Sequence, residues 1–330
     1  MRALQLEQPG AVATAPLRYV ELPTPDPAPN ELAVEVAACA VCRTDLQIVE
    51  GDLASRRVPI IPGHQAVGRV AKVGGAVSGW REGDRAGVGW LASTCGICGF
   101  CTTGRENLCP DARFTGWDRD GGYATAMTVR ADFALRLPDG FDDAAAAPLL
   151  CGGVIGYRSL KISGVTPGGR LGLFGFGASA LLTLQVARHW GCEVHVRTRS
   201  AKEQQRALAF GAATAAGYDE PTPPLEAAVT FAPAGSVVIE ALRNLDRGGT
   251  VAINAIHLDE VPAFSYDLLW LERGLRSVAN YTRQDATEFL ALAGEIPVRT
   301  EHEAFPLEEG NTTLERLKTG GLTATAVLVG

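Results

Sequence analysis

The sequence lacks a basic stripe, a long apolar run and any internal repeat. Its 330 residues include 30 Lys and Arg against 37 Asp and Glu, for a formal net charge of -7 with both signs mixed along the chain. Such a chain offers no positive track for a phosphate backbone, so we expect no nucleic-acid partner. The most apolar window, residues 144–157, is too short to cross a bilayer and contains Pro148, so we expect no membrane segment.

The first ten residues alternate apolar and polar side chains and lack the apolar core of a secretory signal, so we expect a cytoplasmic protein. The cytosol keeps thiols reduced. The eight cysteines therefore favour metal binding or catalysis over disulfides.

The length predicts two domains. Short alternating segments separated by Gly and Pro predict a mostly β first part, at 31–40, 66–75 and 122–140. A helical run follows, with Asp142 or Asp143 as its N-cap.

Residues 170–200 are typical of a strand, a Gly-rich turn, a helix ending at Gly191 and a second strand. Strand and helix signals continue through 200–214, 235–249 and 250–256, which predicts a parallel, doubly wound sheet ending near 280. Helices over 285–298 and 312–321 and a strand over 324–330 complete the chain, and we expect that strand to return to the first domain.

Four cysteines lie close together in the sequence, with the spacing Cys-x2-Cys-x2-Cys-x7-Cys, at Cys95, Cys98, Cys101 and Cys109. Zinc, an iron–sulfur cluster and disulfides all compete for this pattern. The bacterial cluster motif also ends in Cys-Pro but has only three residues before its last cysteine, so the longer gap favours zinc. Four thiolates leave zinc no open position, which makes a lobe over about 90–112 structural.

Cys42, His64 and Cys151 form a second, dispersed candidate set. Three protein ligands with the fourth position open to water are a known catalytic zinc arrangement. From spacing alone, each residue could equally be an isolated core side chain, because free cysteine is often buried.

Five features follow one another along the chain. They are Cys42-Arg43-Thr44-Asp45, Gly63-His64, the four-cysteine lobe, Cys151 and a Gly-rich βαβ unit. In this respect the chain resembles the medium-chain zinc-dependent alcohol dehydrogenases over essentially its full length. The resemblance implies a GroES-like β-rich domain over 1–150 and 281–330, a Rossmann domain over 151–280, and an active site between them. It also implies two zinc ions per chain, one of them catalytic.

The same resemblance implies a role for each residue of the first motif. Cys42, His64 and Cys151 would bind the catalytic zinc, which acts as a Lewis acid on the alcohol oxygen. Thr44 would hydrogen-bond the alcohol, and Asp45 would orient His64 while also capping a helix. Arg43 would touch the cofactor pyrophosphate, unless it is only a solvated surface charge.

Two positions depart from the family pattern. Gln65 stands where many relatives carry Glu, which removes a negative charge near two thiolates. Gln47 stands where some relatives carry a proton-relay His, and glutamine does not titrate at neutral pH. We therefore expect the proton to leave through the cofactor ribose and water.

The segment "GFGASA" places Gly175, Gly177, Ala178 and Ala180 between a strand and a helix, the context of a dinucleotide-binding turn. No carboxylate ends the second strand, where one would bind the ribose 2′-hydroxyl of NAD. Thr198 stands roughly at that position, and Arg199, Ser200 and Lys202 could instead hold a 2′-phosphate, which favours NADP over NAD.

Trp90, Trp117 and Leu150 are candidates for the substrate pocket, with core packing as the alternative for Trp90. A large indole would narrow the pocket and favour small or medium primary alcohols and their aldehydes. The resemblance implies an NAD(P)-linked alcohol dehydrogenase or aldehyde reductase, assembled as a homodimer or homotetramer through the Rossmann sheet. A reductase of another carbonyl or an activated double bond, and a catalytically weak nucleotide- or zinc-binding protein, remain the alternatives.

Overall fold

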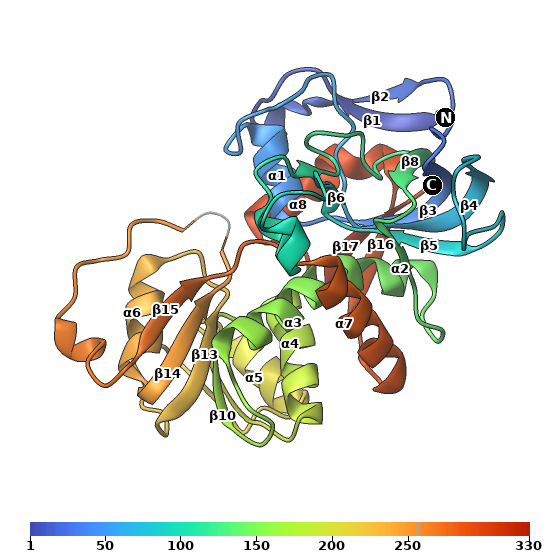
Figure 1. Ribbon diagram of the computed structural model, residues 1–330. Helices are drawn as coiled ribbons and strands as arrows, with labels where there is room; N and C mark the ends of the chain where they lie inside the picture. The colour runs from blue at the N-terminus through green and yellow to red at the C-terminus, as the bar shows by residue number, and fades with distance from the viewer. Residues whose placement is uncertain (256–257) are drawn as a thin grey trace. The chain divides into compact units, whose positions relative to one another are not determined.

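The computed structural model describes residues 1–255 and 258–330, and the chain separates into two compact units (Figure 1). Unit 1 comprises Met1–Cys151, Tyr281–Glu295 and Thr300–Gly330. Unit 2 comprises Gly152–Asn280 and Ile296–Arg299. Cys151, which we expected to open the second domain, lies in unit 1 with Cys42 and His64. Ile256, the end of an expected strand, and His257 lie outside the described residues.

Unit 1 is built on a sheet with the order β16-β17-β3-β4-β5-β9, and β8 also pairs with β3. Its strands are β3 (Glu31–Ala40), β4 (Ala66–Val73), β5 (Arg85–Val88), β8 (Ala126–Arg130), β9 (Ala134–Arg136), β16 (His302–Pro306) and β17 (Thr325–Val329). All pairs are antiparallel except β16 with β17. The last strand pairs with β3, so the chain ends in the unit in which it begins.

The alternation expected in β3 explains how this sheet acquires a core. Leu32, Val34 and Val36 are buried on one face, with 0%, 1% and 7% of their surface exposed. They belong to one apolar cluster with side chains of the hairpin β1 (Arg2–Leu6) and β2 (Leu17–Glu21). Successive strand residues point to opposite faces, so apolar residues at every second position build such a core.

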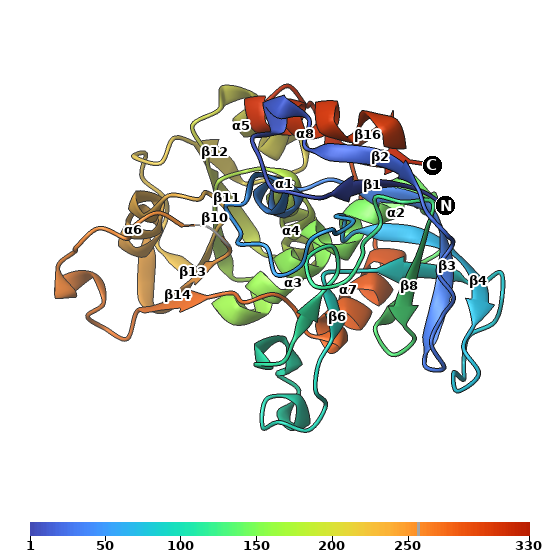
Figure 2. The same ribbon diagram turned by 90° about the horizontal axis from the view of Figure 1, so that it is seen from above.

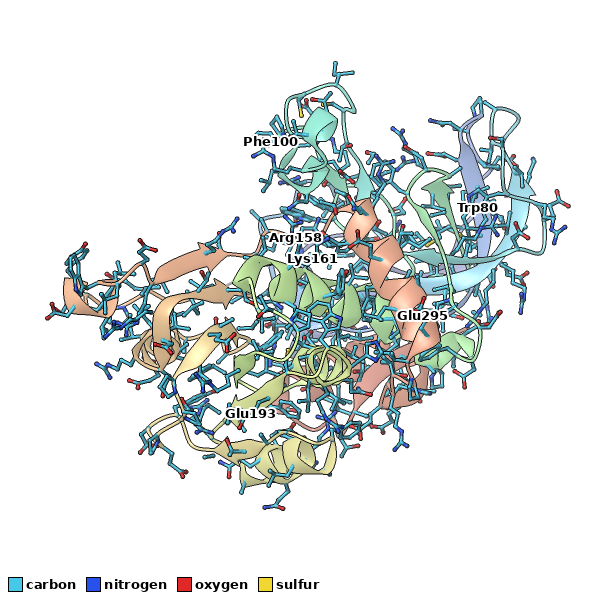
Figure 3. The ribbon with its side chains drawn as sticks, turned by 60° about the horizontal axis from the view of Figure 1, so that its bottom comes forward. Trp80, Phe100, Arg158, Lys161, Glu193 and Glu295 are labelled. Carbon is cyan, nitrogen blue, oxygen red and sulfur yellow. The ribbon has the colours of Figure 1, made fainter. Side chains whose placement is uncertain are left out.

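The helical and short elements of unit 1 border this sheet. They are α1 (Arg43–Glu50), α2 (Asp143–Ala146), α7 (Arg283–Glu295) and α8 (Gly310–Thr319), the 3₁₀ turns η1 (Val12–Thr14), η2 (Cys101–Thr103), η3 (Glu106–Leu108), η4 (Ala147–Leu150) and η6 (Leu307–Glu309), and the strands β6 (Leu91–Ser93) and β7 (Arg113–Phe114). The β6–β7 pair closes the base of the four-cysteine loop, which extends away from the sheet in Figure 2. Phe100 marks this loop in Figure 3.

The single helical run expected after residue 142 is divided into three pieces. Asp142 is the N-cap, since its carboxylate accepts a hydrogen bond from the Ala145 N–H. The chain then passes through α2 and η4, turns at Cys151, and starts again as α3 (Gly152–Ser163). Pro148 has no N–H to donate to a continuing helix, which accounts for the interruption before Cys151.

Unit 2 is a parallel sheet with the order β12-β11-β10-β13-β14-β15. Its elements are β10 (Arg170–Phe174), α4 (Ala178–His189), β11 (Glu193–Arg197), α5 (Ala201–Ala209), β12 (Thr214–Ala216), β13 (Leu225–Thr230), α6 (Gly235–Arg243), β14 (Leu245–Ile253), η5 (Tyr266–Leu268) and β15 (Gly274–Ser277). Glu193 at the start of β11, and Arg158 and Lys161 on α3, are labelled in Figure 3.

The strand order of unit 2 reverses direction at β10. From β10 the chain proceeds through α4 and α5 toward β12, and later through α6 from β13 toward β15. Because parallel crossovers are right-handed, α6 covers the face opposite α4 and α5, as Figures 1 and 2 show. Together the two units are the expected fold, a GroES-like β-rich unit and a doubly wound Rossmann unit. Ligands of such sheets bind where the order reverses, beyond the carboxyl ends of the strands.

Candidate active site and metal centres

Cys42 is held at the start of α1 by a reciprocal cap. Its Sγ accepts a hydrogen bond from the Thr44 N–H at 3.3 Å, and its own N–H donates to Asp45 Oδ2 at 2.9 Å. This arrangement satisfies two of the free N–H groups at the helix end. It also fixes the direction of the thiol. Gly51, with φ 85°, ends the helix after only eight residues.

His64 lies in a loop, and the residue before it must be glycine. Gly63 has φ 93°, and a Cβ there would lie 2.4 Å from Cδ1 of Tyr123. His64 is 1% exposed, and its Nδ1 lies 2.8 Å from Asp45 Oδ1. Because a carboxylate only accepts, Nδ1 carries a proton, and Nε2 is the ring nitrogen that faces the thiol of Cys42. Asp45 therefore caps α1 and orients His64 with one carboxylate, and both contacts follow the expected motif.

Cys42, His64 and Cys151 come together although they are far apart in sequence. One ligand atom from each lies within 4.8 Å of the other two, and His64 Nε2 is 3.4 Å from Cys42 Sγ. A hydrogen bond with Cys151 lowers the pKa of Cys42 well below its usual value and raises that of Cys151. Cys42 is thus the first of the two thiols to ionise. Two sulfurs and an imidazole nitrogen form a donor set that suits zinc.

Gln65 and Gln47, the two departures from the family pattern, lie in different surroundings. Gln65 is 2% exposed, and its amide donates to the Ala40 carbonyl on β3 at 3.4 Å. It therefore brings no charge toward the thiols. Gln47 is half-buried on α1, and Arg43 is exposed beside it.

Trp90 lies against His64 in an aromatic cluster. The two rings meet edge to face with centroids 4.9 Å apart, and Phe114 and Trp117 stack on Trp90 at 5.0 Å and 5.9 Å. Next to this cluster, the Arg56 guanidinium carbon lies 3.7 Å from the centre of the Trp117 ring. Phe114 was not predicted, although it stands three residues before Trp117. Trp90 and Trp117 are half-buried, so both retain an accessible surface.

Leu150 is placed differently from the expectation. It has no exposed surface, and its Cδ2 would lie 2.7 Å from a Cβ at Gly87. This position belongs to the core rather than to an accessible pocket wall. Tyr281, which was not predicted, is 3% exposed and would contact a Cβ at Gly89 with its hydroxyl. Burial raises its pKa, and Cys151 adds to that effect.

The four cysteines of the lobe also converge. Their sulfurs lie within 4.8 Å of one another, with separations of 3.5 Å for Cys95–Cys109 and Cys98–Cys101 and 3.9 Å for Cys95–Cys101. All eight cysteines are free thiols, and these separations are far longer than a disulfide bond. Four sulfurs about 2.3 Å from one tetrahedral ion would be about 3.8 Å apart, so the set fits a single ion.

Backbone N–H groups favour an ionised sulfur at one corner of the lobe. The N–H groups of Ile97 and Cys98 lower the pKa of Cys95 to about 7, whereas burial raises that of Cys109 to about 11. The Cys98 N–H donates to Cys95 Sγ at 3.4 Å, and the Cys95 N–H donates to Cys109 Sγ at 3.5 Å. Such bonds orient thiolate ligands around a metal.

In unit 2, the Gly-rich turn begins where β10 ends. Gly175 has φ 88°, and a Cβ there would lie 2.8 Å from the Ala232 nitrogen. Gly177 caps α4, and a Cβ on it would meet open space. Ala180 is fully buried, whereas Ala178 is exposed at the helix start. The space beside Gly177, at the start of α4, is therefore open, and the N–H groups of such a helix start are able to bind a phosphate.

The end of β11 lies beside this turn, since Phe174 pairs with Arg197 across the ladder. Thr198 is buried, Arg199 is exposed, and the Ser200 hydroxyl caps α5 by accepting from the Glu203 N–H. Burial raises the pKa of Tyr218, and Arg199 opposes that rise, which places Arg199 near this unpredicted aromatic residue. Arg197 is not available to a ligand, because it is buried and donates to the Val196 and Pro221 carbonyls.

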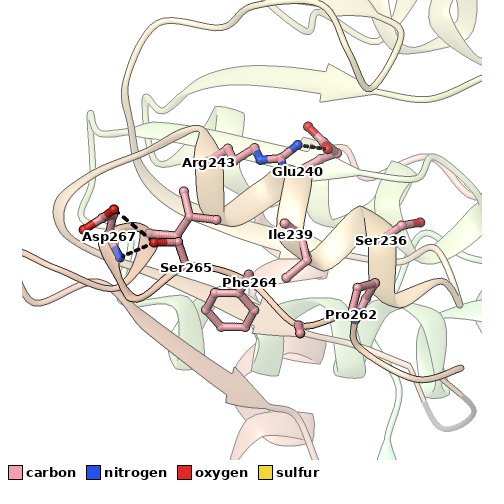
Figure 4. A pocket seen from close by; sticks show the side chains of 10 residues that line it. Ser236, Ile239, Glu240, Arg243, Pro262, Phe264, Ser265 and Asp267 are labelled. Atoms are coloured by element: carbon pink, nitrogen blue, oxygen red, sulfur yellow. Dashed lines mark hydrogen bonds and ion pairs between the residues drawn. The ribbon is translucent and has the colours of Figure 1, made fainter.

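A cavity of about 580 Å³ lies elsewhere in unit 2, between α6 and the segment 262–268 (Figure 4). It shares no residue with the predicted site. The Arg243–Glu240 ion pair crosses one side of it at 2.6 Å. No helix in 1–255 or 258–330 is long and apolar enough to traverse a bilayer.

Known proteins provide the context for this geometry. The profile of the alcohol dehydrogenase GroES-like domain matches residues 28–139. The "Probable alcohol dehydrogenase AdhA" of Mycobacterium tuberculosis is 48% identical over 100% of this chain and 97% of its own length. A cobalt- and zinc-bound thermostable alcohol dehydrogenase from Pyrobaculum aerophilum superposes with a TM-score of 0.90 at 25% identity, covering 100% of this chain and 99% of that one.

A third relative, described as a "putative zinc-binding dehydrogenase" from Sinorhizobium meliloti, was solved with NADP bound. It superposes with a TM-score of 0.85 at 25% identity, and the match covers 100% of this chain and 99% of that one. The identity to the Mycobacterium protein extends over the whole length of both units. The chain belongs to the medium-chain zinc-dependent alcohol dehydrogenase family.

Proposed function

We propose that this alcohol dehydrogenase depends on zinc and transfers a hydride between a small or medium primary alcohol, or its aldehyde, and NADP. The observation that carries the proposal is the convergence of Cys42, His64 and Cys151, with His64 oriented by Asp45. If these cysteines were isolated core residues, there would be no reason for a histidine nitrogen and two thiols to lie within 4.8 Å of one another.

The donor sets fit two zinc ions per chain. Cys42, His64 and Cys151 would hold one with a position left open, and the four lobe cysteines would hold a closed one. A zinc ion bound at the open set supplies Lewis-acid polarisation of the substrate oxygen. The zinc in the Pyrobaculum relative supports this assignment.

The neighbouring residues have separate tasks. Asp45 keeps the proton on Nδ1 of His64, so that Nε2 faces the thiol of Cys42. Thr44 is 7% exposed and adjacent to the cap, a position from which its hydroxyl can hydrogen-bond the alcohol. Gln47 offers no titratable proton and so would not take up the alcohol proton; a bound cofactor would offer its ribose hydroxyls as the way to water instead.

The Gly-rich turn and the end of β11 form the proposed cofactor site in unit 2. Gly175, Gly177, Ala178 and Ala180 bring the pyrophosphate to the start of α4. Thr198, Arg199 and Ser200, with Lys202 nearby, receive the 2′-phosphate, because no carboxylate stands there to repel it. NADP in the Sinorhizobium relative supports this preference, with NAD as the alternative.

The proposed oligomer, a homodimer or homotetramer, forms through unit 2. Among the described strands β15 pairs only with β14, so its outer edge retains free backbone groups. Tyr266 and Trp270, which precede it, are 68% and 58% exposed. Apolar side chains beside a free strand edge are typical of a surface that pairs with a second copy.

Zinc content of the purified chain tests the proposal. We expect about two zinc ions per chain, falling to about one in Cys42→Ala with folding intact, and no change in the control Cys192→Ala. One zinc in all three proteins would mean that the dispersed set is empty and would refute the mechanism. Two zincs without turnover of simple alcohols by NAD(P) would favour a reductase of another carbonyl or double bond, or a weak binding protein.

A further inference from the structure

Arg56 joins two segments of unit 1 at the aromatic cluster beside His64. Its guanidinium carbon lies 3.7 Å from the centre of the Trp117 ring and 5.5 Å from that of Phe114. The same guanidinium donates a hydrogen bond to Asp118 Oδ2 at 3.2 Å. One side chain thus makes a cation–π contact and an ion pair at once. Neither contact has a role in the mechanism proposed above.

The turn that carries Trp117 packs directly on the loop that carries His64. Gly116 has φ 76°, and a Cβ there would lie 2.9 Å from the Gly63 nitrogen. Backbone therefore lies against backbone at this position, with no side chain between the two segments. The distance of this turn from His64 is fixed by that contact.

The indole of Trp117 is held by a segment far from it in sequence. Its Nε1–H donates to the Ala54 carbonyl at 3.0 Å, and the Arg56 guanidinium lies over its ring. Asp118 in turn holds the guanidinium, because its carboxylate is only 6% exposed and a charge buried to this extent needs a partner. The second cation near Asp118 is Arg113, which is farther away at 3.6 Å and is 57% exposed. Arg56 is therefore the main partner of Asp118.

The position of Trp117 limits the position of Trp90. The two indoles stack with their planes 16° apart and their centroids 5.9 Å apart, and Trp90 meets the His64 ring edge to face at 4.9 Å. Both indoles are half-buried, so neighbouring contacts rather than complete burial must hold each one in its rotamer. A cation held on the Trp117 ring therefore restricts the movement of both indoles beside His64.

We propose that Arg56 is a positioning residue that determines substrate size, because it holds the indoles of Trp117 and Trp90 in place and so keeps the space beside His64 narrow. This inference rests on the proposed function, in which these indoles line the substrate pocket. Arginine suits the task, since its planar guanidinium can stack on a ring and bind a carboxylate in one orientation, which the ammonium of lysine cannot do.

The test compares the wild type with Arg56→Met, Trp117→Leu and the double variant. Methionine keeps an unbranched apolar side chain and removes the cation. Arg57→Met is the matched control, because Arg57 is the next residue, is 49% exposed and pairs with Asp120 at 3.1 Å rather than with a residue of the cluster. The measurements are kcat and KM for ethanol and for a bulky secondary alcohol, zinc content, and acrylamide quenching of tryptophan fluorescence, which requires no turnover.

We expect Arg56→Met to raise kcat/KM for the bulky alcohol about twofold to fivefold relative to ethanol. For ethanol, KM should rise and kcat should stay the same, because a wider space weakens binding in the ground state and the transition state alike. Quenching should increase and zinc content should not change. In the Trp117→Leu background the same change should have less than about a 1.5-fold effect, since Arg56 acts through this indole.

An unchanged ratio of kcat/KM values in Arg56→Met, or an equal change in Arg57→Met, would overturn the inference and leave the proposed function intact. A wild type that turns over neither alcohol would overturn both. Should Arg56→Met fail to fold, Arg56→Lys takes its place, with smaller changes expected in the same directions because lysine keeps the charge and loses the planar stack.

Discussion

Nδ1 of His64 lies 2.8 Å from Oδ1 of Asp45, and both side chains are almost completely buried. The same carboxylate accepts from the Cys42 N–H through its other oxygen. Local helix capping and the orientation of a metal ligand therefore depend on one residue. The capping contact alone needs only a side-chain oxygen at this third helical position, which Glu or Gln can also supply. Because position 45 also contacts His64, it requires the carboxylate of an aspartate.

Asp45→Asn should therefore affect the metal site more than the helix. The amide has one oxygen, so either the His64 Nδ1–H or the Cys42 N–H faces an NH₂ group and loses its acceptor. We expect zinc affinity at the open set to fall about 10–100-fold and alcohol turnover to fall with it. Asp142→Asn, at the cap of α2, is the matched control and should keep both zinc ions. Equal zinc retention in the two variants would contradict the orienting role.

Trp90→Ala tests the substrate pocket. The indole lies against His64 and is stacked by Phe114 and Trp117, so its removal opens space beside the proposed ligand. We expect kcat/KM for bulky secondary alcohols to rise about tenfold relative to ethanol. Trp80→Ala, which removes an indole lying 3.6 Å beneath Arg136, is the control for a lost tryptophan. An unchanged substrate profile in Trp90→Ala would assign Trp90 to packing.

The parts of the site that the sequence predicted are those with local signals. The four-cysteine lobe has short fixed spacings, and Cys42 to Asp45 lie within one helical turn. The position of Cys151 beside Cys42 depends on the whole fold, and only the family resemblance indicated it. Phe114 and Tyr123 were missed because their contacts with Trp90 and Gly63 join distant segments.

The fold shows the same division. The alternation in β3 and the βαβ unit from β10 to β11 were predicted, because apolar periodicity is a local property. The central strand β13 was not, although it pairs with β10, the strand at which the sheet order reverses. Its sequence, Leu225-Glu-Ala-Ala-Val-Thr230, has two alanines where a strand pattern calls for larger side chains. Those alanines are fully buried, so close packing within unit 2, rather than the strand preference of the residues, accounts for the strand at this position.

Arg199→Ala tests the choice of cofactor. The side chain is exposed at the end of β11, so the change should not disturb folding. We expect KM for NADP to rise about tenfold and KM for NAD to stay the same, because only NADP carries the 2′-phosphate. The control is Arg247→Ala, which removes an exposed arginine elsewhere in unit 2. A wild type that strongly prefers NAD would refute the assignment of Thr198, Arg199 and Ser200.

Glu50 links the end of α1 to α8 and should make the stability of unit 1 depend on pH. Its Oε1 accepts from the Val12 N–H and from Lys318 Nζ, each at 2.8 Å. Burial acts to raise the pKa of Glu50, but these two donors outweigh it and lower the pKa. A carboxyl whose pKa is lower in the folded state stabilises the protein above the unfolded pKa, about 4.3, and loses this effect as the pH falls through the folded value.

Glu50→Gln should therefore destabilise the protein at pH 7 by about 0.5–1 kcal/mol, the range of a partly exposed ion pair. The difference from the wild type should shrink below about pH 4, because the wild-type carboxyl then takes up a proton. Urea unfolding at several pH values measures both effects. In a Lys318→Met background the pH-dependent part should be smaller, since the main donor is gone. A Glu50→Gln effect that is constant from pH 7 to pH 3 would show that the side chain contributes packing rather than charge.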